Sequence, residues 1–212
     1  MKKIGFDLWG TLVEANPLFK ERKQDLFKKH FPYSPSVNFE GEMLSIKTDL
    51  NNIINDSGWQ PSDELIINLI ATRFGTSGDK ATRFLLDYQR LAIVYAPLLI
   101  LPTTKQILEN LAKKDYELHI ISNTMFIKGD ALREHLHFLG IGQLFKSMRF
   151  SDSVKYAKPD IRIFSSQKLD YFVGDNAHVD GAYAKKIGAR FIQINTNDKT
   201  IEDAYDIITK GQ

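Results

Sequence analysis

The chain has 212 residues, of which 43% are hydrophobic and 25% are charged, and its formal net charge is +2 at pH 7. These values are typical of a globular protein that forms one large domain, or a core with a small accessory domain. The balanced charge gives no reason to expect nucleic acid or a membrane surface as a partner. Because the chain has no cysteine, disulfides, thiolate metal sites and a cysteine nucleophile are excluded.

The first residues do not have the pattern of a secretory leader. Asp7 interrupts the apolar residues before a hydrophobic region of useful length forms. No stretch approaches the about 20 consecutive apolar residues that a membrane-spanning helix needs. We therefore expect a cytoplasmic protein, while its oligomeric state stays open.

The first part of the chain predicts one strand followed by helices. Residues 3–8 form an apolar run typical of a strand, and residues 10–16 form a turn that leaves the sheet. Pro17 suits the first turn of a helix. Residues 18–95 predict four helical segments, because their apolar residues recur at helical spacing. Three pairs of helix-breaking residues separate these segments: Pro32 and Pro35, Gly58 and Pro61, and Gly75 and Gly78.

From Pro97 onward, helices and strands alternate. The pattern predicts helices over residues 103–113, 128–139, 159–169 and 179–187, and strands over 117–121, 148–150, 169–173 and 190–194. Strands that alternate with helices of this length indicate right-handed crossovers and a parallel, doubly wound sheet. We therefore expect an α/β protein with a helical bundle inserted after its first strand.

Two strands of this predicted sheet are followed by acidic residues. Asp7 comes at the end of the first strand, Asp175 comes just after the strand over 169–173, and Asp180 follows. Ligands bind at this edge of an open parallel sheet. Two carboxylates a few ångströms apart repel each other, and a hard dication with oxygen ligands removes that repulsion. If Asp7 and Asp175 converge, we expect a metal ion between them.

Four short motifs in this order resemble those of the haloacid dehalogenase-like hydrolases, a superfamily made mostly of phosphatases that form an aspartyl intermediate. They span residues 7–12, 120–123, 158–160 and 173–180. The resemblance covers residues 1–15 and about 97–195. It implies a Rossmann-like catalytic core of residues 1–15 and 96–212, and the subfamily in which a helical cap, here residues 16–95, is inserted after the first strand.

The resemblance implies that Asp7 is the nucleophile, which becomes an aspartyl phosphate and is then released by water. A carboxylate is ionised at neutral pH, with an ordinary pKa of about 3.9. Phosphoryl-transfer transition states are loose, so a weak nucleophile such as a carboxylate is sufficient. The resemblance also implies that Mg²⁺ is held by Asp7, by the backbone carbonyl of Trp9 and by Asp175. A backbone carbonyl does not depend on the side chain that it belongs to, so Trp9 keeps that role.

Phosphate binding is implied for Thr11, Ser122, Asn123 and Lys158, of which Ser122 and Lys158 would also act in catalysis. The Ser122 hydroxyl and nearby backbone N–H groups would hold a phosphate oxygen, although this cluster also suits a helix cap. The Lys158 ammonium would offset the charge of the nucleophile and the substrate. Lys155 is close enough in the sequence to be an alternative.

Two residues in the last motif have open roles. Asp180 either takes part in catalysis by positioning water or caps the helix that follows. His178 lies between Asp175 and Asp180, and it either replaces a missing acid or is an exposed loop histidine.

Trp9 is the departure from the family pattern. The family's phosphatases usually have a second Asp two residues after the first, which is their general acid and base. The indole N–H of Trp9 donates a hydrogen bond but cannot shuttle a proton. Losing such a group removes a factor of roughly 10²–10⁴ in rate. The substitution therefore favours substrates with good leaving groups, such as acyl or aryl phosphates.

Three functions compete. The leading one is a Mg²⁺-dependent phosphohydrolase that acts on a small phosphorylated metabolite selected by the cap. The second is a 2-haloacid dehalogenase, because that branch commonly has an aromatic residue where this chain has Trp9, and a halide leaves without a proton. Dehalogenases are metal-independent, however, and typically have Ser at the position of Asp175. The third is a catalytically weak member that binds a ligand.

Overall fold

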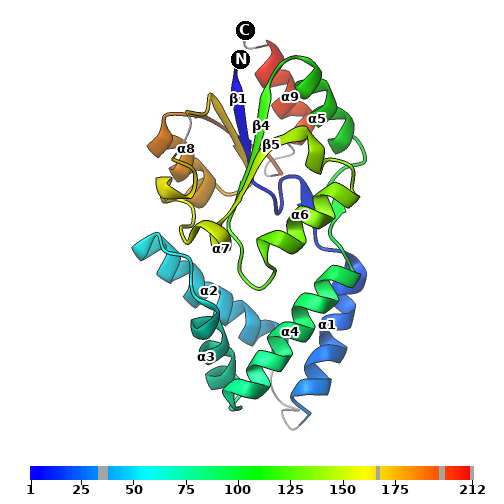
Figure 1. Cartoon of the computed structure of the whole chain (residues 1–212), viewed down its shortest axis with the longest axis vertical. Helices are drawn as coiled ribbons and strands as arrows, with labels where there is room; N and C mark the ends of the chain where they lie inside the picture. Colours follow the sequence, from blue (N-terminus) through cyan, green and yellow to red (C-terminus); the bar gives the residue numbers. More distant parts are fainter. Residues whose placement is uncertain (33–37, 166–167, 196–198, 211–212) are drawn as a thin grey trace.

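A five-stranded parallel sheet forms the centre of the molecule, with strand order β5-β4-β1-β6-β7 (Figure 1). The computed structural model describes residues 1–32, 38–165, 168–195 and 199–210, so Pro35 lies outside the described residues. The strands are β1 Lys3–Phe6, β4 Glu117–Ser122, β5 Phe145–Phe150, β6 Tyr171–Gly174 and β7 Arg190–Gln193. The expected doubly wound α/β fold is confirmed.

Both faces of the sheet are buried, which explains why its strands are nearly continuous apolar runs. Alternate residues of each strand point to opposite faces. On one face, Phe6 and Ile120 join the largest apolar cluster, and on the other, Ile121 and Phe172 join a smaller one.

Helices cover the two faces. The larger cluster includes residues of α5 Thr104–Lys113, α6 Gly129–Phe138 and α9 Ile201–Lys210. The smaller cluster includes residues of α8 Ala182–Ile187. A short helix, α7 Ser151–Val154, follows β5.

The segment between β1 and β4 contains a bundle of four helices, as its periodicity predicts. They are α1 Pro17–His30, α2 Phe39–Ser57, α3 Asp63–Arg73 and α4 Gly78–Val94. Side-chain oxygens of Asn16, Asn38, Ser62 and Ser77 accept hydrogen bonds from backbone N–H groups of the first turns. The bundle has its own apolar cluster, centred on phenylalanines such as Phe27, Phe74 and Phe84.

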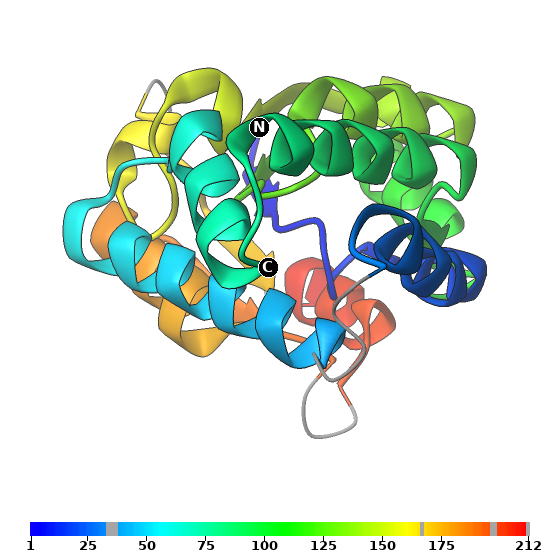
Figure 2. The same cartoon turned by 90° about the horizontal axis from the view of Figure 1, so that it is seen from below.

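The bundle lies beyond the carboxyl ends of the strands. Both views place α2 and α3 on the side of α7 and α8, and α1 and α4 on the side of α6 (Figures 1 and 2). Met125 and Phe126, from the loop between β4 and α6, pack against the bundle's apolar cluster. These separate clusters support a division into a core of residues 1–15 and 96–212 and a cap of residues 16–95, which stays our proposal.

The structure differs from the sequence prediction in several elements. The helix expected over residues 159–169 is wrong: the described residues form a 3₁₀ helix, Ile161–Phe164. Asp160 caps this helix by accepting from the Arg162 N–H, and one turn suffices to bury Ile163 and Phe164 against the sheet. The expected turn over residues 10–16 contains strand β2 Val13–Glu14, which pairs with β3 Leu98–Leu99. Helix α9 was not predicted.

Within the described ranges, none of the helices is long and apolar enough to cross a membrane.

Candidate active site

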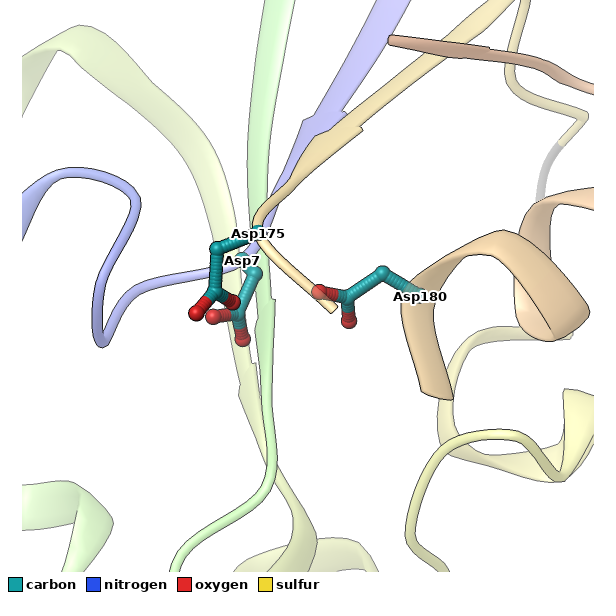
Figure 3. A group of neighbouring side chains, drawn as sticks. All are labelled: Asp7, Asp175 and Asp180. Atoms are coloured by element: carbon teal, nitrogen blue, oxygen red, sulfur yellow. The ribbon is translucent and has the colours of Figure 1, made fainter. Parts of the chain in front are cut away.

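Three carboxylates converge where β1 and β6 end (Figure 3). Asp7 and Asp175 follow these neighbouring strands, and their side chains lie side by side, while Asp180 points toward them from the start of the next helical segment. The Asp7 N–H donates to the Val173 carbonyl at 2.9 Å, which extends the pairing of the two strands up to the site. One oxygen from each carboxylate lies within 4.8 Å of the others.

Two glycines leave the space that these carboxylates occupy. Gly10 has a φ of +72°, which favours glycine, and a Cβ there would lie 2.6 Å from Oδ2 of Asp175. A Cβ on Gly174 would lie 2.6 Å from Cγ of Asp180. Since real Cβ contacts are not this short, a larger residue at either position would displace an acid.

A single turn of π-helix, Ala177–Gly181, places Asp180. Asn176 caps this turn by accepting from the N–H groups of His178 and Val179. The Asn176 N–H in turn donates to Oδ2 of Asp180 at 3.2 Å. Asp180 is 2% exposed. The helix that follows, α8, has no side-chain hydrogen bond at its N-cap, so the alternative in which Asp180 caps it is wrong. Asn176 has this capping role, which the sequence reading missed although Asn is a common cap.

The Lys158 ammonium joins two of the three acids. It donates to Oδ1 of Asp7 at 2.6 Å and to Oδ1 of Asp180 at 2.8 Å. Lys158 is 1% exposed, whereas the alternative, Lys155, is exposed. Burial disfavours the charged ammonium, but the attraction of Asp180 and Asp7 outweighs it and holds the pKa of Lys158 above its ordinary value.

The carboxylates are harder to ionise than in water. Burial raises the pKa of Asp7 to about 6, with a further rise from the charge of Asp180, while Lys158 opposes the shift. Burial and the same Asp180 charge also raise the pKa of Asp175. The site thus has more negative charge than the Lys158 ammonium offsets.

This donor set fits a hard dication. Carboxylate oxygens are preferred ligands of Mg²⁺ and Ca²⁺. A dication would offset both the burial and the repulsion from Asp180 that raise the pKa values of Asp7 and Asp175. Asp7, Asp175 and Asp180 are the group of acidic and histidine side chains that converges in the described part of the chain. The carbonyl of Trp9 as a further ligand stays a prediction.

Asn123 and Ser122 lie at the end of β4, beside this site. The Asn123 side chain bonds both polar groups of the Lys158 backbone: Nδ2 donates to its carbonyl at 2.8 Å, and Oδ1 accepts from its N–H at 2.7 Å. Asn123 therefore positions Lys158, and its expected contact with phosphate stays a prediction. Ser122 is 1% exposed, and its hydroxyl makes a long hydrogen bond of 3.5 Å to the Asn123 carbonyl. The roles proposed for Ser122 stay predictions as well.

Thr11 is fully buried. Its hydroxyl has no hydrogen-bond partner among the described residues, so its contact with phosphate also stays a prediction.

Trp9 packs where the bundle joins the core. With Phe19, Tyr95 and His135 among the other lining residues, it borders a cavity of about 10 Å³, enough for roughly one water molecule. Its ring also packs against the larger apolar cluster. The side chain therefore provides packing at a position where an acid would provide a proton.

His178 lies outside this acidic group, and two arginines of the bundle are paired with acids. His178 is exposed and does not belong to the acidic group found among the described residues. In the bundle, Arg73 pairs with Asp49 at 2.8 Å and Arg90 pairs with Asp87 at 3.1 Å.

Comparison with known proteins gives a family match over most of the chain. The family model of the haloacid dehalogenase-like hydrolases matches residues 4–194. No protein with a curated description matches the sequence.

Solved structures with this fold include hydrolases of several kinds. The hydrolase YfnB from Bacillus subtilis, which was solved with bound magnesium, has a TM-score of 0.73, 16% identity, and 98% of each chain covered. A 2-haloacid dehalogenase from Pseudomonas syringae pv. Tomato DC3000 has a TM-score of 0.69, 18% identity, and 100% of each chain covered. A phosphatase from Thermococcus onnurineus has a TM-score of 0.65, 20% identity, and 98% of each chain covered. At these identities, the likeness shows the fold.

Proposed function

We propose that this chain, which belongs to the haloacid dehalogenase-like hydrolases, is a Mg²⁺-dependent phosphohydrolase acting through an aspartyl phosphate. Its substrate would be a small phosphorylated metabolite, and residues 16–95 would be its cap. A cytoplasmic location also stays a prediction.

The observation that carries the proposal is the presence of a further acid, Asp175, beside Asp7. Removing two carboxylates from water is costly unless their charge is used or neutralised. The Lys158 ammonium bonds Asp7 and Asp180, while Asp175 is half-buried and has a raised pKa. A bound dication gives Asp175 a role as a metal ligand. A reaction in which Asp7 alone displaces halide gives Asp175 no role.

In the first step, Asp7 attacks phosphorus. Oδ1 accepts from Lys158, so Oδ2 is the attacking oxygen. A bond forms between Oδ2 and phosphorus, the ester P–O bond breaks, and the electron pair leaves on the substrate oxygen. The Lys158 ammonium offsets negative charge during the transfer. When bound, Mg²⁺ would supply electrostatic stabilisation of the phosphoryl group.

In the second step, a water oxygen attacks phosphorus, the bond between phosphorus and Asp7 breaks, and its electron pair returns to the carboxylate. Both protons of the water leave on the released dihydrogen phosphate. Trp9 offers neither an acid for the first step nor a base for the second. The substrate oxygen therefore takes its proton from solvent, and this requirement favours leaving groups that are stable as anions.

Trp9 is also the observation that favours a second candidate, a 2-haloacid dehalogenase. In that reaction, Asp7 would attack carbon, the carbon–halogen bond would break, and halide would leave without a proton. An apolar ring in place of the acid would therefore not lower the rate of that reaction.

One experiment separates these functions. Phosphate release is measured on acyl, aryl and alkyl phosphates with Mg²⁺ or EDTA, using the native protein, Asp7→Asn, and Asp56→Asn as an exposed control on α2. We expect release that requires Mg²⁺ and Asp7 but not Asp56. Chloride release from 2-haloacids in EDTA, without phosphate release, would replace the proposal with the dehalogenase.

A further inference from the structure

A segment of the helical bundle pairs with the backbone that leads to Lys158. Residues 58–60, between α2 and α3, are here called the strap, and residues 155–158 the lysine loop. The Gln60 N–H donates to the Lys155 carbonyl at 3.1 Å, and the Ala157 N–H donates to the Gly58 carbonyl at 3.0 Å. Trp59 and Tyr156 form the antiparallel bridge between them.

Side chains fasten the strap to the lysine loop. The rings of Trp59 and Tyr156 lie 4.7 Å apart, and the Arg162 guanidinium lies 4.1 Å from the Tyr156 ring centre and 5.3 Å from that of Trp59. Asp160 holds this guanidinium through two hydrogen bonds, of 2.9 and 2.7 Å. Gly58 allows the close approach, because a Cβ there would lie 2.9 Å from the Asp160 Cβ. The contact is thus a packed junction.

On its other side, the lysine loop is held by the segment that follows β4. Asn123 bonds both polar groups of the Lys158 backbone, at 2.7 and 2.8 Å. The strap reaches this segment too, because Nε2 of Gln60 donates to the Thr124 carbonyl at 3.1 Å. The lysine loop is therefore held by Asn123 on one side and by the strap on the other. From this backbone, the Lys158 ammonium reaches Asp7.

We propose that the strap is a positioning element for Lys158, with Trp59 as its positioning residue. By fixing the lysine loop, it keeps the Lys158 ammonium on Asp7 and Asp180, and it thereby couples the placement of the bundle to the charge at the nucleophile. A lysine side chain has many rotamers, so its ammonium stays in one place only if its backbone is fixed. The expected effect on turnover rests on the proposed function, whereas the effect on Lys158 does not.

The test is a double-mutant cycle between Trp59 and Lys158. Trp59 is 49% exposed, so Trp59→Ala removes the ring contact with little loss of core packing. Trp59→Phe keeps a ring over Tyr156 and serves as the rescue variant. Lys158→Met keeps the apolar stem without the charge. Leu44→Ala, on an α2 side chain that is 63% exposed, is the matched control.

Two measurements are made on each variant. Mg²⁺ affinity by calorimetry at pH 8 should rise about threefold in Trp59→Ala, since the dication no longer competes with an ordered ammonium. Turnover at saturating substrate should fall roughly tenfold, with KM changing less, since a misplaced group weakens catalysis more than binding. Trp59→Phe should recover both values, and Leu44→Ala should leave them unchanged. In the Lys158→Met background, Trp59→Ala should have no further effect.

A third measurement requires neither metal nor turnover. Amide hydrogen exchange of residues 155–158 should be faster in Trp59→Ala than in the native protein, with the exchange of β4 unchanged. Unchanged exchange in the lysine loop would overturn the strap proposal, as would an effect of Trp59→Ala that persists in the Lys158→Met background. If the native protein neither binds Mg²⁺ nor releases phosphate, the proposed function fails, and the exchange measurement still decides on the strap.

Discussion

The side chain of Asn123 holds the backbone of Lys158 in both directions, donating to its carbonyl at 2.8 Å and accepting from its N–H at 2.7 Å. This contact joins the end of β4 to the loop after α7, and these two segments are far apart in the sequence. It sets the origin of a side chain whose ammonium lies 2.6 Å from Asp7. The ion pair between Lys158 and Asp7 therefore depends on Asn123, which belongs to neither side chain of the pair.

We expect Asn123→Ala to lower turnover by roughly 10- to 100-fold, because Lys158 loses its fixed origin. Leaving two backbone groups unpaired should also cost about 1–3 kcal/mol of folding free energy. Asn123→Asp keeps the hydrogen-bond acceptor and loses the donor. Its turnover should therefore lie between that of the native protein and that of Asn123→Ala. Steady-state kinetics and urea unfolding measure both effects, with Asn55→Ala, an exposed change on α2, as control. Native turnover in Asn123→Ala would contradict the positioning role.

Trp9→Asp should restore the missing acid and base. We expect turnover of alkyl phosphates to rise by roughly 10²-fold, with a smaller gain on aryl phosphates, whose leaving groups need no proton. Losing the packed ring should destabilise the protein by about 2 kcal/mol. Trp9→Asn loses the same packing without supplying an acid, so it is the matched control. The comparison is the ratio of kcat/KM for alkyl and aryl substrates, and equal ratios in both variants would refute the prediction.

The raised pKa of Asp7, about 6 against an ordinary value of 3.8, predicts how stability depends on pH. Between roughly pH 4 and pH 6, the folded protein binds more protons at Asp7 than the unfolded chain does, so stability without metal falls as pH rises through this window. The loss is at most roughly 3 kcal/mol, since one pKa unit corresponds to about 1.4 kcal/mol. Mg²⁺ needs ionised ligands, so its affinity should rise over the same window.

Thermal unfolding from pH 4.5 to 8, with EDTA or Mg²⁺, tests both parts. In EDTA the midpoint should fall with rising pH, and the gap between the two curves should widen. Asp7→Asn should flatten the EDTA curve over the range where Asp7 titrates. If the unfolding midpoint of the native protein in EDTA does not fall with rising pH, the pKa of Asp7 is not raised.

Asp87 on α4 predicts an acid-sensitive contact within the bundle. Its carboxylate bonds the side chains of Lys29 at 3.0 Å and His30 at 2.9 Å, both at the end of α1. These two hydrogen bonds hold the pKa of Asp87 at about 2. The stability that they contribute is therefore present above pH 4 and is lost as pH falls toward 2.

We expect Asp87→Asn to cost roughly 1 kcal/mol at pH 7, a modest value because Asp87 is partly exposed. Urea unfolding should show a difference from the native protein at pH 7 that shrinks below pH 4. Asp79→Asn, in the first turn of the same helix, is the control. A difference that is equally large at pH 2.5 would show that the contact does not depend on charge.

The sequence by itself determined the elements of the sheet and the edge at which the acids gather. Apolar runs and helical spacing follow from local backbone geometry, so they are visible without the fold. Once parallel strands were predicted, the positions of Asp7 and Asp175 at one edge followed from topology alone. Where local signals were short, as in residues 159–169, the prediction failed.

Only the tertiary structure decided which side chains meet at that edge. No local sequence pattern indicates the hydrogen bonds of Lys158 to Asp7 and Asp180, or those of Asn123 to the Lys158 backbone. The same is true of the pairing between the strap and the lysine loop. Polar groups find these partners because burial makes an unpaired donor or acceptor costly, and the fold determines which partner is within reach. The sequence therefore predicted the acids, and packing selected the residues that hold them.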